Sequence, residues 1–262
     1  MWLDLPAIEA ALQTSFTGRR FIYLTSTSST MDVARAEAES GAEEGTVVLA
    51  EEQTAGRGRF GRQWLSPAGK NIYLTLLLRP TVDQLRRLSI ITPLAVALAI
   101  EETTGLTPQI KWPNDVLLSG RKVSGILIET DFSGSEPRYA LLGPGVNVNF
   151  EIDPASEIAG IATSLKQELG ADVTREAVLA ALLNHLEALY TAPDPRAVRE
   201  AWKSRLETLG RDVTLTFRGE SFPGHAEDVD DAGNLILRLP DGSHRTFEAG
   251  EVSLRATDTA TS

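Results

Sequence analysis

The hydrophobic pattern of the chain changes at Gly210, and this change sets the limits on its fold. Before Gly210, apolar β-rich runs alternate with polar, glycine-containing joints; the runs are RRFIYLTS, GTVVLAEEQ, KNIYLTLLLRP, KVSGILIET and YALLGPGVNVNF. After Gly210, the segments RDVTLTFRG, GNLILRLPDG and GEVSLRA alternate apolar and polar residues between tight turns. We therefore predict an α+β domain at 1–209, a small all-β barrel at 210–256 and a disordered tail at 257–262.

Helical segments separate the strands of the first part. Residues 32–40 are rich in alanine and glutamate, and residues 83–104 carry apolar side chains at near-helical spacing and end at a glycine. Pro93 is expected to kink or split this second helix. Apolar residues at helical spacing also predict amphipathic core helices at 174–190 and 195–209.

The composition limits the classes of partner and site. A formal net charge of -11 over 262 residues argues against a surface that tracks DNA or RNA. The absence of cysteine excludes disulfides and thiolate sites, and the three histidines are scattered, so any metal is expected to be a hard cation bound by oxygen. No apolar run reaches the roughly 18 to 20 residues that span a bilayer, and the N-terminus lacks signal-peptide features, so we expect a cytoplasmic protein without a membrane partner.

The segment TAGRGRFGRQW, at 54–64, concentrates three glycines and three arginines in this acidic chain. Glycine lets the backbone approach a ligand closely, and the arginine side chains offer donor forks that suit carboxylate and phosphate. The residues alone leave a simple mobile loop or an RGG-like nucleic-acid segment equally open, because glycine-rich patterns are weak signals. The segment is not a Walker A loop, since no GK[ST] follows it.

The segment KWPNDVLLSGRKVSGILIE, at 111–129, predicts a β-hairpin closed by the turn SGR. Such a hairpin would bring Asn114 and Asp115 close to Lys122, where their oxygens could bind Mg²⁺ or a hydrogen-bond donor. The alternative is structural, because Asn and Asp are common turn residues and a lysine beside a turn is usually only solvated. Gly125 favours a functional interpretation, since glycine inside a strand often marks the close approach of a ligand or a backbone.

Two shorter segments carry polar side chains at the ends of predicted elements. STSSTMD, at 26–32, reads first as a helix N-cap, although its hydroxyl groups would also suit a small polar ligand. GPGVNVN places Asn147 and Asn149 on one face of a predicted strand, where asparagine is uncommon.

In this order and spacing, the segments resemble the biotin protein ligase family. The resemblance rests on STMD (29–32), EEQTAGRGRFGRQW (51–64), KWPNDVLLSGRKVSGILIE (111–129), GVNVN (145–149), ATSL (162–165) and GEVSL (250–254). It implies a mixed β-sheet catalytic domain of the class II synthetase-like fold, packed with helices, and an SH3-like C-terminal barrel. The implied activity is a C–N bond-forming ligase that makes biotinyl-5'-AMP from biotin and ATP and then biotinylates one lysine of a biotin carboxyl carrier protein.

The resemblance also implies the residues of the site. The biotin-binding set would be Ser29, Thr30, Gln53, Gly56, Arg57, Arg59, Lys122 and Gly125. The ATP-binding set would be Arg59, Arg62, Trp64, Asn114, Asp115, Lys122 and Asn147, with Trp64 packing on adenine. Lys122, Arg59 and Asp115 would be catalytic, and Asp115 would be the metal ligand. ATP and Mg²⁺ would bind as a substrate complex, without a tightly bound prosthetic group.

Two points of the sequence depart from the pattern of some relatives, and two further expectations concern the dimer and the nucleotide. Some relatives have tryptophan where Ala162 stands, so adenine would depend more on Trp64. About twenty residues precede the first predicted strand, too few for a three-helix DNA-binding unit, so we expect a monofunctional ligase that does not bind DNA. Relatives dimerise to different degrees, which leaves a homodimer open. Arg255 is expected to contact the nucleotide.

Two other functions fit the sequence less well than biotin ligation. A lipoate or octanoate ligase or transferase of the same fold fits the RKVSG and GRGRFGR segments less well. A non-catalytic biotin-binding or nucleic-acid-binding module is disfavoured by the net charge and by the presence of both Lys122 and Asp115.

Overall fold

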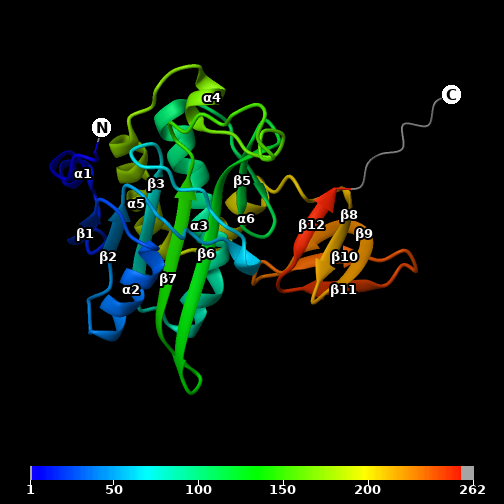
Figure 1. The fold of residues 1–262 in the computed structure, drawn as a ribbon. Coiled ribbons are helices and arrows are strands. Elements are labelled where there is room, and N and C mark those ends of the chain that lie inside the picture. Colours follow the sequence, from blue (N-terminus) through cyan, green and yellow to red (C-terminus); the bar gives the residue numbers. More distant parts are fainter. Residues whose placement is uncertain (1, 255–262) are drawn as a thin grey trace.

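The structure is a computed structural model that describes residues 2–254, and it contains two separate sheets (Figure 1). The larger sheet has seven strands in the order β1-β2-β3-β7-β6-β5-β4. Only β1 and β2 run parallel, so the sheet is mixed, as expected. Its strands are β1 (Arg20–Leu24), β2 (Thr46–Ala50), β3 (Ile72–Leu78), β4 (Gln109–Lys111), β5 (Asp115–Leu118), β6 (Arg121–Ser133) and β7 (Glu136–Val146).

The helices cover the two faces of this sheet unequally. Val47, Leu76 and Leu142 share one buried cluster with α3 and α5, whereas Val48 and Leu141, from the alternate face, pack with α2. Helix α2 packs mainly on β2, β3 and β7, and its Arg35 also pairs with Glu129 of β6, so α2 covers only part of this face. The helices are α1 (Leu5–Ala11), α2 (Thr30–Glu39), α3 (Val82–Thr104), α4 (Leu165–Leu169), α5 (Arg175–Tyr190) and α6 (Pro195–Lys203).

Two predicted helices differ in detail from the structure. Pro93 lies inside α3 without splitting it, and this helix begins at a capping box from Thr81 and ends at Gly105 in the left-handed conformation. The helix predicted at 195–209 ends at Lys203. The amide of Leu206 donates to the carbonyl of Lys203, three residues earlier, instead of continuing the α-helical pattern. The amide of Glu207 donates to the carbonyl of Ile110 on β4, so pairing with the sheet ends the helix early.

The C-terminal sheet has five antiparallel strands in the order β11-β10-β9-β8-β12 (Figure 1). They are β8 (Asp212–Phe217), β9 (Glu220–Val229), β10 (Leu235–Arg238), β11 (His244–Phe247) and β12 (Glu251–Leu254). Val213 and Leu215 on β8 and Leu235 and Leu237 on β10 are buried as predicted, whereas the other two predicted inward residues, Phe217 and Leu239, are half-buried. Strands β9 and β11 were not predicted, because polar and charged side chains interrupt their alternation. Arg255 and the predicted tail at 257–262 lie outside the described residues.

A buried tryptophan connects the two sheets. Trp112 follows β4 and is 2% exposed, and its indole nitrogen donates to the carbonyl of Gly233, 2.9 Å away in the C-terminal part. The turn that follows it, from Pro113 to β5, is therefore fixed against both sheets. Among the described residues, no helix is long and apolar enough to cross a membrane.

Candidate active site

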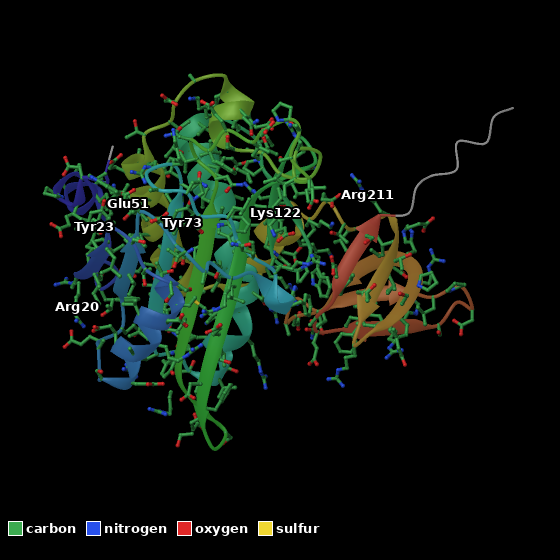
Figure 2. The ribbon with its side chains drawn as sticks, in the orientation of Figure 1. Arg20, Tyr23, Glu51, Tyr73, Lys122 and Arg211 are labelled. Atoms are coloured by element: carbon green, nitrogen blue, oxygen red, sulfur yellow. The ribbon has the colours of Figure 1, made fainter. Side chains whose placement is uncertain are left out.

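One row of residues across the larger sheet forms the floor of a cavity of about 690 Å³. The row runs through directly paired neighbours, Lys111, Asp115, Gly125, Gly145 and Tyr73, on β4, β5, β6, β7 and β3. All five line the cavity, and they lie on the face that α2 covers only in part. Figure 2 labels Tyr73 on this row. The sheet thus presents charge at one end of the row and bare backbone in its centre.

The bare centre of the row is covered by Trp64. A Cβ atom added to Gly145 would lie 2.6 Å from the indole nitrogen of Trp64, and one added to Gly125 would lie 3.1 Å from its ring. Glycine at both positions is therefore required for the ring to lie on the sheet. The indole nitrogen is buried and has no hydrogen-bond partner among the described residues. Gly125 predicted the close approach of a ligand or a backbone; in the structure the groups that approach it are side chains, those of Trp64 and Lys122.

Lys122 and Asp115 form an ion pair beside this centre, with Nζ and Oδ1 2.7 Å apart. The pair exists because β5 and β6 form the hairpin that the sequence predicted, with a register shift that moves Lys122 toward Asp115. Nζ also lies 5.4 Å from the centre of the Trp64 ring. The Lys122 backbone is held on both sides, by the carbonyl of Ile161 at 2.8 Å and the amide of Thr163 at 2.9 Å. Figure 2 shows Lys122 between the two sheets.

The segment at 54–64 folds back on itself over the cavity. Its turn is closed by the amide of Gly58 on the carbonyl of Arg62, at 2.8 Å, and by the amide of Trp64 on the carbonyl of Gly56, at 2.9 Å. Phe60, at the tip, has φ of 57° and is 68% exposed. Gly56 does not line the cavity: a Cβ there would meet the Trp64 carbonyl at 2.6 Å, so this glycine closes the turn.

Each arginine of this segment has a protein partner. Arg57 binds Asp32 of α2 through two hydrogen bonds of 2.6 and 2.9 Å, which hold the pKa of Asp32 below its usual value. Arg62 binds Glu251 of β12 at 2.6 Å. Arg59 donates instead to neutral groups, the Asn114 side chain at 3.0 Å and the carbonyl of residue 250 at 3.4 Å. Burial lowers the pKa of Arg59, so an anion beside it would relieve the cost of its buried charge.

The predicted hydroxyl and amide groups of the biotin set meet at one end of the cavity. Ser29 caps α2 by accepting from the amide of Met31 at 3.3 Å, which confirms the N-cap interpretation. Thr30 donates from its hydroxyl to the side-chain oxygen of Gln53 at 3.1 Å, and Gln53 donates to Ser66 at 3.1 Å. Ser29, Thr30 and Gln53 all line the cavity.

Asn147 lies just beyond β7, because this strand ends at Val146. The prediction that Asn147 and Asn149 lie on one strand face is therefore wrong. Both side chains instead replace the strand pairing that ends here: Asn147 donates to the carbonyl of Thr163 at 3.0 Å, and Asn149 exchanges two hydrogen bonds with Val173. Of the two, only Asn147 lines the cavity.

Comparison with known proteins matches this arrangement over nearly the whole chain. Residues 23–147 match the biotin/lipoate A/B protein ligase family and residues 208–255 match the biotin protein ligase C-terminal domain. The biotin–[acetyl-CoA-carboxylase] ligase of Paracoccus denitrificans is 38% identical over 214 residues, which cover 78% of this chain and 88% of the relative. The chain belongs to the biotin protein ligase family. The biotin–[acetyl-CoA-carboxylase] ligase of Mycobacterium tuberculosis is 34% identical over 248 residues, which cover 89% of this chain and 88% of the relative.

A solved structure supports the same assignment for the fold of this biotin protein ligase. The biotin protein ligase from Aquifex aeolicus in complex with biotin and ATP superposes with a TM-score of 0.75 at 30% identity, covering 91% of this chain and all of that one. The predicted fold class, a mixed sheet with helices followed by a small antiparallel β domain, is confirmed.

The ligase cavity contains residues that the motifs alone did not single out. Tyr73, Gly145 and Lys111 belong to the row, and strand register is the signal that would have found them. Arg211 lines the cavity from the linker before β8 and pairs with Glu207 at 3.1 Å. Lys111 forms no ion pair within 4 Å among residues 2–254, although it lies opposite Asp115.

Proposed function

We propose that this ligase joins the carboxylate of biotin to the α-phosphate of ATP and then passes biotin to one lysine of a biotin carboxyl carrier domain. In the first step a carboxylate oxygen attacks the α-phosphorus and pyrophosphate leaves. In the second the lysine nitrogen attacks the acyl carbon, loses a proton and releases AMP. The observation that carries the proposal is the Lys122–Asp115 pair beside Gly125 and Gly145, here called the glycine floor, in a cavity that is also lined by the segment at 54–64, here called the arginine loop.

The first step brings a carboxylate against a triphosphate, so fixed cations must offset their repulsion. Lys122 is placed to contact both the reacting carboxylate and the α-phosphate, because it lies between the glycine floor and Asp115. Arg59 and Lys111 have no carboxylate partner among the described residues, which leaves them available to the phosphates. Biotin would lie toward Ser29, Thr30 and Gln53, and the nucleotide toward Asn114 and Asn147.

Mg²⁺ is assigned to the ATP complex. Within residues 2–254, no three carboxylate or histidine side chains gather as metal ligands, which fits an ion held mainly by phosphate oxygens. Asp115 and the side-chain oxygen of Asn114 would complete its shell, and the ion would offset phosphate charge.

The second step needs the acceptor lysine as a neutral amine, which is scarce at neutral pH because an unperturbed lysine has a pKa of about 10.4. Asp115 is the carboxylate nearest to the reacting groups and would take the proton once the phosphates draw Lys122 away from it. No covalent enzyme intermediate is required.

Arg59 is proposed to close the loop over biotinyl-AMP and keep water out. Arg59→Gly is expected to increase the release of biotinyl-AMP about ten- to a hundredfold, since a hydrogen bond from a charged group contributes roughly 1.5–3 kcal/mol. The measurement is biotinylation of lysines on an unrelated bystander protein, followed by mass spectrometry. Arg218→Gly is the control, because Arg218 is an exposed residue in the turn between β8 and β9 with φ of 53°, which suits glycine. Equal bystander labelling by both variants would remove the lid role.

The choice of acyl group is tested directly. The protein is incubated with ATP, Mg²⁺ and either biotin or lipoate, and the acyl-adenylate and the modified carrier domain are identified by mass spectrometry. We expect biotinyl-AMP and a biotinylated carrier lysine. Formation of lipoyl-AMP without biotinyl-AMP would reverse the proposal in favour of the lipoate or octanoate reaction.

A further inference from the structure

Asn71, immediately before β3, is a fully buried amide that the proposed chemistry does not use. Its side-chain oxygen accepts from the amide of Val148 at 2.9 Å, and its side-chain nitrogen donates to the Asn147 oxygen at 3.3 Å. Its backbone carbonyl accepts from Arg175 at 3.0 Å. The side-chain oxygen and nitrogen of Asn71 therefore both have partners, and the partner of the nitrogen, Asn147, lines the cavity.

This arrangement allows one orientation of each amide. A backbone N–H can only donate, so the amide of Val148 requires the oxygen of Asn71 to face it. The Asn71 nitrogen must then face Asn147 and requires its oxygen in return. A backbone carbonyl can only accept, and the carbonyl of Thr163 faces the Asn147 nitrogen at 3.0 Å, in agreement with the same orientation.

The orientation has a consequence inside the cavity. Asn147 is 6% exposed, and one of its two side-chain N–H groups is used by Thr163. The other has no protein acceptor among the described residues. Asn147 therefore offers the cavity a hydrogen-bond donor, and an acceptor on the ligand, such as a ring nitrogen of a nucleobase, is the group that this donor would meet.

The hydrogen bonds around Asn147 extend to the backbone of Lys122. Thr163, whose carbonyl Asn147 binds, donates its own amide to the Lys122 carbonyl at 2.9 Å. Asn147 also donates its backbone amide to the carbonyl of Val123, at 2.8 Å. Asn71 is thus connected through one side chain to both the nucleotide end of the cavity and the strand that carries Lys122.

We propose that Asn71 is a positioning residue for the nucleotide, acting by fixing the Asn147 amide with its N–H toward the base. The inference rests on the proposed function, because it takes ATP as the ligand at this end of the cavity. Asn71 itself touches no substrate. The biotin head group is proposed to lie at Ser29, Thr30 and Gln53, away from the Asn147 side chain. The effect of Asn71 is therefore expected on KM for ATP and not on KM for biotin, because the Lys122 backbone, near the group that both substrates share, is also held by the carbonyl of Ile161.

The test is Asn71→Asp, which keeps the size of the side chain and the bond to Val148 but replaces the donor toward Asn147 by an oxygen. We expect KM for ATP to rise about tenfold, the value of one hydrogen bond of roughly 1.4 kcal/mol, with KM for biotin unchanged. Asn149→Asp is the matched control. Asn149 makes the same kind of two-bond contact, to Val173, but does not line the cavity. The variant Asn149→Asp should therefore lower the melting temperature and leave both KM values unchanged.

Analogues of ATP that lack one ring nitrogen supply a readout that a merely structural role would not move. If Asn147 donates to that nitrogen, the matching deaza-ATP should have a KM about tenfold higher than that of ATP in the wild type. In Asn71→Asp the same analogue should raise KM no further than ATP itself shows. Equal rises of both KM values in Asn71→Asp, or additive losses with every analogue, would overturn the proposal. If Asn71→Asp does not fold, Asn71→Ser carries the same measurements. Failure of the wild type to form biotinyl-AMP would instead refute the proposed function.

Discussion

Lys122→Ala is expected to slow the rate of biotinyl-AMP formation by at least about 10²–10³-fold. This is the scale on which removal of one fixed electrostatic group slows a reaction that develops charge. The ammonium group of Lys122 is the cation nearest to the glycine floor, and its ion pair with Asp115 holds it in place before substrates arrive. Without it, the cation proposed to contact both the biotin carboxylate and the α-phosphate is lost, so their repulsion is offset less. The measurement is pyrophosphate release in the presence of biotin, with circular dichroism to establish the fold.

A lysine outside the cavity provides the control for this variant. Lys166 is also paired with carboxylates, Glu151 and Asp172, but on the surface near α4. Lys166→Ala removes the same charge and should keep the rate within about twofold, because exposed ion pairs contribute little. Normal turnover by Lys122→Ala would remove this residue from the mechanism.

Arg175→Met is expected to have the largest effect on folding, lowering the free energy of unfolding by roughly 3–5 kcal/mol at neutral pH. Arg175 and Glu51 form an ion pair of 2.7 Å with side chains 5% and 0% exposed, between α5 and the end of β2. Removal of Arg175 leaves the Glu51 carboxylate buried without its counter-ion. Urea unfolding followed by circular dichroism measures the loss, and Arg196→Met, on the exposed side of α6, should change it by less than about 0.5 kcal/mol.

The pH dependence of this effect follows from the pKa of Glu51. Burial alone would raise that pKa, but the hydrogen bonds from Arg175, Tyr23 and the amide of Leu3 outweigh burial and hold it below its usual value. The wild-type pair therefore stabilises the fold fully above the ordinary carboxyl range, about 4 to 5, and less as the pH falls through the lowered pKa. In Arg175→Met, burial should raise the pKa of Glu51, so acid would neutralise the stranded charge. The stability gap between the two proteins should narrow from pH 7 to about pH 5; a constant gap would contradict a charge origin.

The parts of the site that could be predicted from the sequence are local ones. The hairpin between β5 and β6 depends on a short turn and flanking apolar residues, so the proximity of Lys122 and Asp115 could be predicted from spacing, whereas the register shift that moves Lys122 toward Asp115 could not. The cap at Ser29 is equally local. The ordered motifs then identified the family, because several weak signals in a fixed order are specific together.

What could not be predicted depends on register and on distant partners. Lys111, Gly145 and Tyr73 belong to the cavity because antiparallel pairing aligns them with Asp115 and Gly125 in one row. No spacing along the chain encodes that alignment. Gly56 is a different case: its place in the motif predicted a ligand contact, which stays a prediction, and its neighbours in the structure are the Trp64 carbonyl and Ser66.

The division into domains is a further prediction that stays a proposal. The pattern change at Gly210 agrees with the start of β8 at Asp212, and the cavity is lined from both sides of that point. Trp112 and Gly233 join the two parts directly. We propose a catalytic domain at 1–209 whose site is completed by the C-terminal sheet.

Two arginines of the segment at 54–64 are paired with carboxylates of the same protein, so we propose that substrate anions bind them by exchange with those carboxylates. Arg57 and Arg62 are already neutralised by Asp32 and Glu251, and a substrate carboxylate or phosphate must displace those carboxylates to bind the same side chains. Such an exchange conserves the number of ion pairs, so added salt weakens the old and the new contacts together. Substrate affinity should therefore change less with ionic strength than six cavity cations would suggest: Arg57, Arg59, Arg62, Lys111, Lys122 and Arg211. This exchange should favour the substrates over other anions, because only a ligand with the right geometry forms ion pairs as stable as those that it displaces.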